Sequence, residues 1–234
     1  MNGTIAGDAG KRNHGTYRLG EAAAAADLDR YMAVATVPFL SAQGRSRLLA
    51  LILLHNELRR VRTLVREPFP GLIRLQWWRD QLSSNEPGVP EFLTCLRSTG
   101  LADEIAGLAD PFADALEQQA GDAASGPDAA HVRASAMLQR CSARILGETR
   151  AEFLDRASAV GAAYALSLGE NPDDKATARH RLAFARSGPP PPRGVMPAFA
   201  LAHVAGFRLR AGRVARPPLT MPFRLFLNTL ARRI

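Results

Sequence analysis

The sequence predicts an all-α protein built as a single-domain helical bundle. Apolar side chains recur at spacings of three and four residues through much of the 234-residue chain. The period-two alternation of β-branched and aromatic residues that indicates strands is nowhere convincing. The composition, 47% hydrophobic and 22% charged, is that of a globular chain long enough to bury one sizeable core. An ordinary helical domain is therefore the expectation.

The N-terminal part divides into a polar leader and a first helix. Residues 1–18 are polar and contain glycine, and we expect a disordered leader here, followed by one domain over residues 19–234. The alanine-rich stretch from Leu19 to Met32 has a high helix propensity. Pro38 ends or bends that helix.

The strongest helical signal lies between Gln43 and Glu67. Five apolar residues recur there at helical spacing: Leu51, Leu54, Leu58, Val61 and Val65. Pro68 and Pro70 are expected to end this helix. The next helix is expected over Leu72–Ser83, before a loop rich in proline.

Further helices are expected over the middle of the chain and become shorter near its end. The middle segments are Glu91–Gly100, Leu101–Ala109, Pro111–Ala120, Ala129–Gly147 and residues 148–169. After Gly169, frequent prolines leave room only for short helices. The two plausible ones are Pro197–Arg210 and Pro222–Ile234.

The positive charge is concentrated in the proline- and arginine-rich C-terminal part, residues 171–234. This part holds twelve basic and two acidic residues, a net charge of +10, whereas residues 1–170 carry −2. Nothing after Asp174 is acidic. Such a segment would attract an anionic partner: a lipid headgroup, a diphosphate, an acidic protein surface or nucleic acid. Nucleic acid is the least expected of these, because no nucleic-acid-binding motif accompanies the charge.

Several classes of protein are not supported by the sequence. The longest apolar run, Leu48–Leu54, is far shorter than a membrane-spanning helix, and the N-terminus lacks the apolar core of a secretory signal. Cys95 and Cys141 are far apart and form no CxxC motif, so we expect reduced, buried thiols. No Walker loop, GxGxxG, HExxH or Ser/His/Asp set is present. An intracellular protein is the default expectation.

One stretch resembles a known family. Residues 45–82 read RSRLLALILLHNELRRVRTLVREPFPGLIRLQWWRDQL. This stretch resembles, in the order and spacing of its motifs, the N-terminal helix pair of the squalene/phytoene synthase family. The motifs are an arginine, an ALxxL helix, NELxxVRxLVxEPxPG and IRLQWWRD. The similarity is to the branch that includes assembly factors of respiratory complex I. Weaker similarity covers Tyr31–Leu40 and Val160–Leu168, the latter similar to the family's G-x-A-x-x-L helix.

The resemblance implies an all-α isoprenoid synthase fold but not the family's chemistry. Catalytic members join prenyl diphosphates head to head, and two aspartate-rich motifs hold the magnesium ions that bind the diphosphate. Residues 59–63, aligned with the first motif, read RRVRT and contain no carboxylate. Near the second motif only Asp173 and Asp174 are present, and both are shifted. They are weak candidates for one cation, or residues of a solvated turn.

A cationic set replaces the first motif. His55, Arg59, Arg62 and Arg66 are spaced four, three and four residues apart, which predicts one stripe on the helix. If this stripe faces a cavity, it could bind a diphosphate or phospholipid headgroup through arginine without magnesium. If it faces water, it is a solvated surface.

The remaining family-motif residues are candidates for structural or partner-binding roles. They are Asn56, Glu57, Arg74, Gln76, Trp77, Trp78 and Arg79. Glu57 can pair with Arg60 or with Arg74. Trp77 and Trp78 lie 100° apart on a helix, so both can be buried only if the helix is covered over a wide face.

Together these observations predict a divergent squalene/phytoene synthase-like protein without catalytic residues or cofactor. It would act as a binding or assembly factor near respiratory membranes, with a protein partner in complex assembly and with anionic lipid or prenyl diphosphate as further candidate ligands. The expected location is the cytoplasm, or peripherally on the inner membrane, on the matrix side in a mitochondrion. One alternative is an active prenyltransferase using Mg²⁺ in terpenoid biosynthesis. A second is an arginine-rich nucleic-acid-binding protein.

Overall fold

The computed structural model describes residues 18–65, 67–84, 86–120, 127–211, 220–231 and 234. All regular secondary structure in these ranges is helical, which confirms the all-α class. The expected leader lies outside the described residues, except for Arg18, which is already helical.

The helices follow one another with short connections. After a helical segment over residues 18–26, they are α2 (Leu28–Ala35), α3 (Ala42–Leu64), α4 (Pro68–Ser83), α5 (Glu91–Arg97), α6 (Ala102–Ala106), η1 (Gly107–Ala109), α7 (Asp110–Ala120), α8 (Pro127–Ile145), α9 (Ala151–Ser167), α10 (Pro172–Arg186), η2 (Arg193–Val195), α11 (Pro197–Ala211) and α12 (Met221–Leu230).

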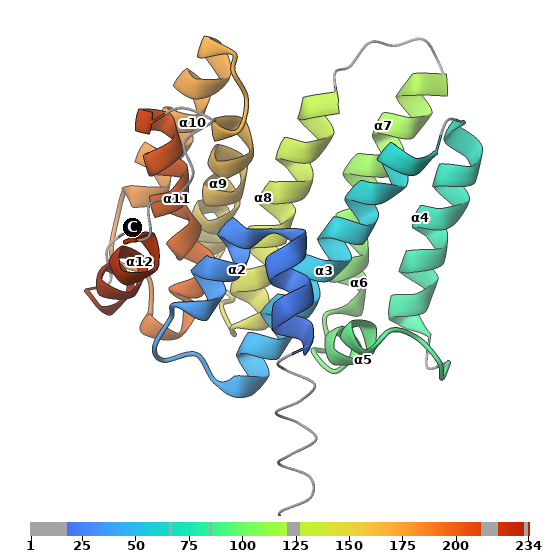
Figure 1. Ribbon diagram of the computed structural model, residues 1–234, viewed down its shortest axis with the longest axis horizontal. Helices are drawn as coiled ribbons and strands as arrows, with labels where there is room; N and C mark the ends of the chain where they lie inside the picture. Colours follow the sequence, from blue (N-terminus) through green and yellow to red (C-terminus); the bar gives the residue numbers. More distant parts are fainter. Residues whose placement is uncertain (1–17, 66, 85, 121–126, 212–219, 232–233) are drawn as a thin grey trace, which may run out of the picture.

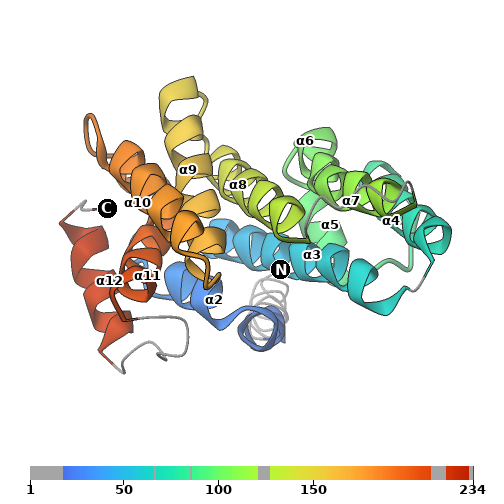
Figure 2. The same cartoon turned by 90° about the horizontal axis from the view of Figure 1, so that it is seen from above.

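The molecule has two sides joined by a central pair of helices. α4 to α7 lie on one side and α9 to α12 on the other, with α3 and α8 between them (Figures 1 and 2). One hydrophobic cluster is formed chiefly by α3, α4, α7 and α8, and includes Leu54, Leu75 and Phe112. A second is centred on α9 and α11, and includes Val160 and Phe199. The packing of α8 against α9 connects the two clusters.

Gly161 permits the close packing of α8 against α9. A Cβ atom at this position would lie 2.1 Å from the backbone oxygen of Ser135. The Ser135 hydroxyl in turn donates to the Gly161 backbone oxygen at 2.6 Å. The glycine of the G-x-A-x-x-L segment therefore has a packing role.

Two proline-containing helix starts differ from the expectation. α4 begins at Pro68 rather than Leu72, because prolines fit the first turn of a helix, where the backbone N–H has no intrahelical partner. α10 is a 15-residue helix that starts at Pro172, so the expectation of only short helices after Gly169 is wrong for this segment. Its N-cap is Asn171, whose side chain accepts from the Asp173 backbone N–H at 3.0 Å.

The alanine-rich helix is also divided where the sequence predicts one element. Asp27 lies between residues 18–26 and α2, and its side chain accepts from the Arg30 backbone N–H at 3.0 Å. This is N-cap geometry, which favours a new helix start over continuation. In the separate helix α2 that follows, Asp29 and Arg30 are buried.

Candidate functional site

The three predicted cationic residues of α3 that the structure describes, His55, Arg59 and Arg62, differ in burial. His55 is only 3% exposed and packs near Phe112 and His131, with ring centroids 6.1 and 6.0 Å away. Arg59 is exposed and Arg62 is half-buried, whereas Arg66 lies outside the described residues. α3 keeps these positions at helical spacing, but His55 is buried whereas Arg59 is exposed.

Burial also decides the charge of His55. Desolvation lowers its pKa well below 6.5, and the charges of Arg30, His131 and Arg59 lower it further. The side chain is thus neutral at physiological pH. Its Nε2 atom is buried without a hydrogen-bond partner among the described residues. A neutral, desolvated imidazole is not the anion-binding cation that the spacing suggested.

The end of α3, where the resemblance places the first aspartate-rich motif, is a solvated cationic surface. Arg59 donates to the Asn56 side-chain oxygen at 3.2 Å. Arg60 forms an ion pair with Glu57 at 2.9 Å, so Glu57 takes the first of its two predicted partners. Both arginines are exposed. These side chains are held by neighbours on the same helix.

The two tryptophans of α4 have different environments. Trp78 is 6% exposed and packs near Phe92, with ring centroids 5.9 Å apart. Trp77 is 44% exposed and meets Trp78 edge to face at 4.7 Å. Trp78 is therefore a core residue, whereas Trp77 is available at the surface.

The polar residues of this motif lie on the same helix as Trp77 and contact one another and α7. Gln76 donates to Asp80 at 2.7 Å and accepts from Arg79 at 3.2 Å. Arg79 also forms an ion pair with Asp110 of α7. Arg74 is exposed to solvent. These contacts fix α4 against α7 and hold a polar border beside its outer face.

An apolar stripe on the outer face of α4 was not predicted from the sequence. Phe69, Ile73 and Trp77 are spaced four residues apart and are 71%, 56% and 44% exposed. We call these three residues the α4 apolar stripe. Contiguous exposed apolar side chains of this size are typical of interaction surfaces. Because the helix also carries a buried face, its sequence pattern alone does not show which residues stay exposed.

The second motif position carries few potential metal ligands. Asp173 is exposed and Asp174 is half-buried, and both lie in the first turn of α10 rather than in the expected solvated turn. Asp174, Glu170 and His131 line an open pocket of about 350 Å³ between α8, α9 and α10. Throughout the described ranges, however, no three His, Cys, Asp or Glu side chains are grouped so that they could hold a metal ion. Acids in a first turn are favoured by the helix dipole, a sufficient reason for their presence.

Sequence reasoning missed a buried polar network beside α2. Asp29 accepts hydrogen bonds from Tyr164 at 3.0 Å and from Arg208 Nε at 2.9 Å. Arg30 donates to Ser135 at 2.6 Å and stacks over the Tyr164 ring at 4.8 Å. The only signal in the sequence is the charged DLDR group within an alanine-rich helix. Because the network connects α2 with α8, α9 and α11, its first effect is structural.

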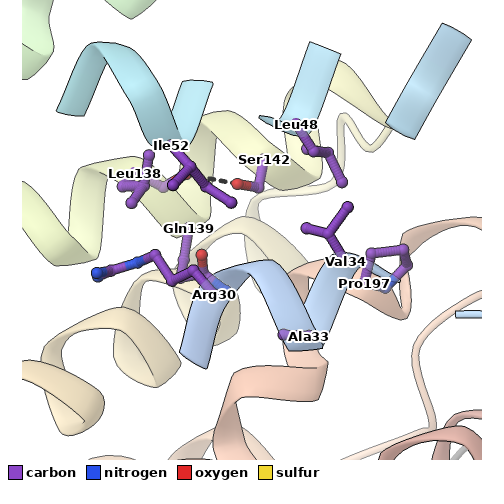
Figure 3. Close-up of a pocket in the computed structure, with 9 residues that line it drawn as sticks. All are labelled: Arg30, Ala33, Val34, Leu48, Ile52, Leu138, Gln139, Ser142 and Pro197. Carbon is purple, nitrogen blue, oxygen red and sulfur yellow. Dashed lines mark hydrogen bonds between the residues drawn. The ribbon is translucent and has the colours of Figure 1, made fainter. Parts of the chain in front are cut away.

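A small cavity lies between α2, α3, α8 and α11. Its volume is about 10 Å³, roughly enough for one water molecule. Figure 3 shows the lining: Arg30, Ala33, Val34, Leu48, Ile52, Leu138, Gln139, Ser142 and Pro197. Gln139 donates across the interface to the Ala198 backbone oxygen at 2.8 Å. Packed side chains thus leave no room here for an isoprenoid chain.

The two cysteines are free thiols. Cys141 is buried and Cys95 is half-buried. Burial raises the pKa of Cys141 to about 12, which removes its thiolate at neutral pH.

Comparisons of the chain with protein-family models, curated proteins and solved structures found no match. Over the ranges that the structure describes, no helix combines the length and apolar character needed to cross a membrane.

Proposed function

We propose that this chain is a divergent, non-catalytic squalene/phytoene synthase-like protein that acts by binding, as an assembly factor or scaffold near respiratory membranes. The resemblance of residues 45–82 supports the family and the isoprenoid synthase type of fold. The loss of metal chemistry rests on one observation above all. Where magnesium ligands would be required, α3 presents exposed Arg59 and Arg60.

The interior packing supports the same conclusion. Hard oxygen ligands are required to hold Mg²⁺ on a diphosphate, and in the described residues Asp174 of the second motif position belongs to no group of three or more side chains that could hold a metal ion. The cavity between α2, α3, α8 and α11 has a volume of about 10 Å³, roughly enough for one water molecule. We therefore expect no condensation of prenyl diphosphates.

The α4 apolar stripe is the surface that we assign to a protein partner. Aromatic residues are enriched at protein interfaces, and the exposed Trp77 ring packs edge to face against the core residue Trp78. Arg74, Gln76 and Arg79 supply a polar border of the kind that surrounds interface centres.

A ligand screen tests the loss of catalysis. We expect farnesyl or geranylgeranyl diphosphate to give no turnover and no magnesium-dependent rise in melting temperature. Magnesium-dependent turnover that disappears in an Asp173→Ala, Asp174→Ala double variant would overturn the proposal in favour of a prenyltransferase.

A proximity-labelling experiment in respiring cells tests the partner. We expect respiratory-complex subunits or assembly intermediates to be labelled, and the labelling to be lost in an Ile73→Ser, Trp77→Ser double variant. Leu28→Ser is the control, because Leu28 is 55% exposed on α2, away from the stripe. Equal labelling by both variants would contradict the assigned surface. Absence of respiratory proteins from the wild-type sample would contradict the assembly role.

A further inference from the structure

A second surface lies on the opposite side of the molecule from α4. α10 and α11 pack side by side near α12 (Figures 1 and 2). Their side chains line an open groove of about 440 Å³. α10 contributes positions 179, 182, 183 and 186, and α11 contributes 206, 209 and 210, so each helix presents one face. The lining residues are Arg179, Leu182, Ala183, Arg186, Gly206, Leu209 and Arg210.

The charged side chains that line the groove are all positive, and both helices contribute them. Arg179, Arg186 and Arg210 are exposed, and none of them pairs with an aspartate or glutamate side chain within the described part of the chain. The neighbouring Arg208 is different, because it pairs with Asp29 beneath α11. The sequence contains no aspartate or glutamate after Asp174, so the segments that follow α10 supply no acidic side chain.

Two of the guanidinium groups meet above Gly206. A Cβ atom at Gly206 would lie 3.4 Å from Arg186 Nη2 and 3.6 Å from Arg210 Nη1. Arg186 Nε donates to the backbone oxygen of Ile234 at 2.9 Å, which orients its guanidinium group. Partial burial and the charge of Arg210 both lower the pKa of Arg186, as expected for like charges held together. An anion between them would relieve this repulsion.

We propose that the groove between α10 and α11 binds a phosphate group, held by Arg186 and Arg210 with Arg179 at its edge. Guanidinium groups donate paired hydrogen bonds that match phosphate oxygens. Leu182 and Leu209 supply an apolar wall for the substituent that carries the phosphate. The site is separate from the α4 apolar stripe and does not depend on the proposed function.

The phosphate can belong to a soluble diphosphate or to a lipid headgroup. Beside the groove, α12 exposes Phe223, Phe226, Leu227 and Leu230, and such a face can enter the headgroup region of a membrane. One arm of the experiment therefore titrates inorganic diphosphate by calorimetry. The other measures sedimentation with phosphatidylcholine vesicles, with and without phosphatidic acid.

Three variants distinguish a site from a diffuse basic surface. Arg186→Gln with Arg210→Gln removes the site, and we expect at least about a tenfold loss of binding. Arg181→Gln with Arg224→Gln removes the same charge from exposed residues outside the groove, and we expect less than about a threefold loss. Gly206→Leu keeps every charge but fills the groove, and we expect a loss like that of the first variant. Circular dichroism establishes that each variant is folded.

The outcomes decide both the site and the source of its ligand. Diphosphate binding that follows this pattern supports a soluble ligand, and the same pattern only on phosphatidic acid vesicles supports a lipid. Equal losses in the two arginine pairs would overturn the proposal, as would unchanged binding by Gly206→Leu. Failure of the wild-type protein to bind either probe would also overturn it. If Arg186→Gln prevents folding, Arg179→Gln with Arg210→Gln replaces that variant under the same criteria.

Discussion

At the residue scale, we expect a side chain at Gly161 to destabilise the fold, because backbone atoms rather than flexible side chains occupy the space beside it. A Cβ atom here would lie 2.1 Å from Ser135 O and 3.0 Å from Ala136 Cα. We expect Gly161→Ala to force α8 and α9 apart and to lower the free energy of unfolding by about 2–3 kcal/mol or more. Urea denaturation measures the loss. Gly194→Ala is the control, since no atom lies within 4 Å of its Cβ position, and an equal loss there would contradict the packing argument.

Arg156 is a buried charged residue whose hydrogen bonds are expected to stabilise the fold. It is 2% exposed and donates to the backbone oxygens of Ala185 at 2.9 Å and Pro189 at 2.7 Å. Arg156→Met keeps much of the volume but leaves both acceptors without this donor, so we expect a loss of about 2–4 kcal/mol in urea denaturation. Arg140→Met, at an exposed ion pair with Asp155, should change stability by less than about 1 kcal/mol. Similar losses of unfolding free energy in Arg156→Met and Arg140→Met would contradict a special stabilising role for the buried arginine.

His55 makes the stability depend on pH. Its pKa in the folded protein lies well below 6.5, whereas the unfolded side chain titrates near 6.5. Between these two pKa values the unfolded chain binds more protons than the folded protein does, so the folded state loses stability as the pH falls below about 6.5. We expect His55→Leu to reduce this loss, as measured by denaturation at a series of pH values. An unchanged slope below pH 6.5 in the variant would contradict a neutral, buried His55.

At the element scale, α2 is attached through the ion pair of Asp29 with Arg208. The two side chains are 6% and 14% exposed, so removing one charge leaves the other poorly solvated. We expect Asp29→Asn to cost about 3 kcal/mol and to speed hydrogen exchange in α2 and α11 before the rest of the protein. Asp114→Asn, at the exposed ion pair with Arg133, is the matched control. Uniform exchange across all helices in Asp29→Asn would contradict a local attachment.

Helix positions were largely predictable from the sequence, and the errors concern proline and caps. The spacing of Leu51, Leu54 and Leu58 predicts α3 because those side chains share one buried face. The rule that proline interrupts a helix predicts helix ends near Pro68 and Pro172, although each occupies a first turn, where proline costs no hydrogen bond. Whether a helix ends before a proline or begins at it depends on the backbone conformation and capping hydrogen bonds of the preceding residue. The presence of the proline alone does not predict these.

The candidate surfaces were less predictable than the helices. Spacing places His55 and Arg59 on neighbouring parts of α3, but only the packing of Phe112 and His131 decides that His55 is buried. The groove between α10 and α11 joins Arg186 to Arg210, 24 positions apart in the sequence. Contacts between separate helices depend on their docking, and one helix's periodicity carries no information about it.

At the scale of the whole molecule, the two hydrophobic clusters should unfold together. They meet along α8 and α9, and Gly161 allows these helices to pack with their backbones in contact. Both tryptophans lie in α4, so their fluorescence reports the cluster of α3 to α8 alone, whereas far-UV circular dichroism reports all helices. We expect the two signals to give one coincident transition in urea.

A substitution in the opposite cluster provides the decisive test of this coupling. Phe199 of α11 is fully buried, and Phe199→Ala should cost about 3–5 kcal/mol. If the clusters are coupled, the midpoint of the tryptophan transition moves by the same amount as the circular dichroism midpoint, although Phe199 belongs to the other cluster. A tryptophan midpoint that stays in place while circular dichroism shows an earlier loss of helix would mean that the two sides unfold separately. The α8 and α9 interface would then be too weak to couple the α4 apolar stripe with the groove between α10 and α11.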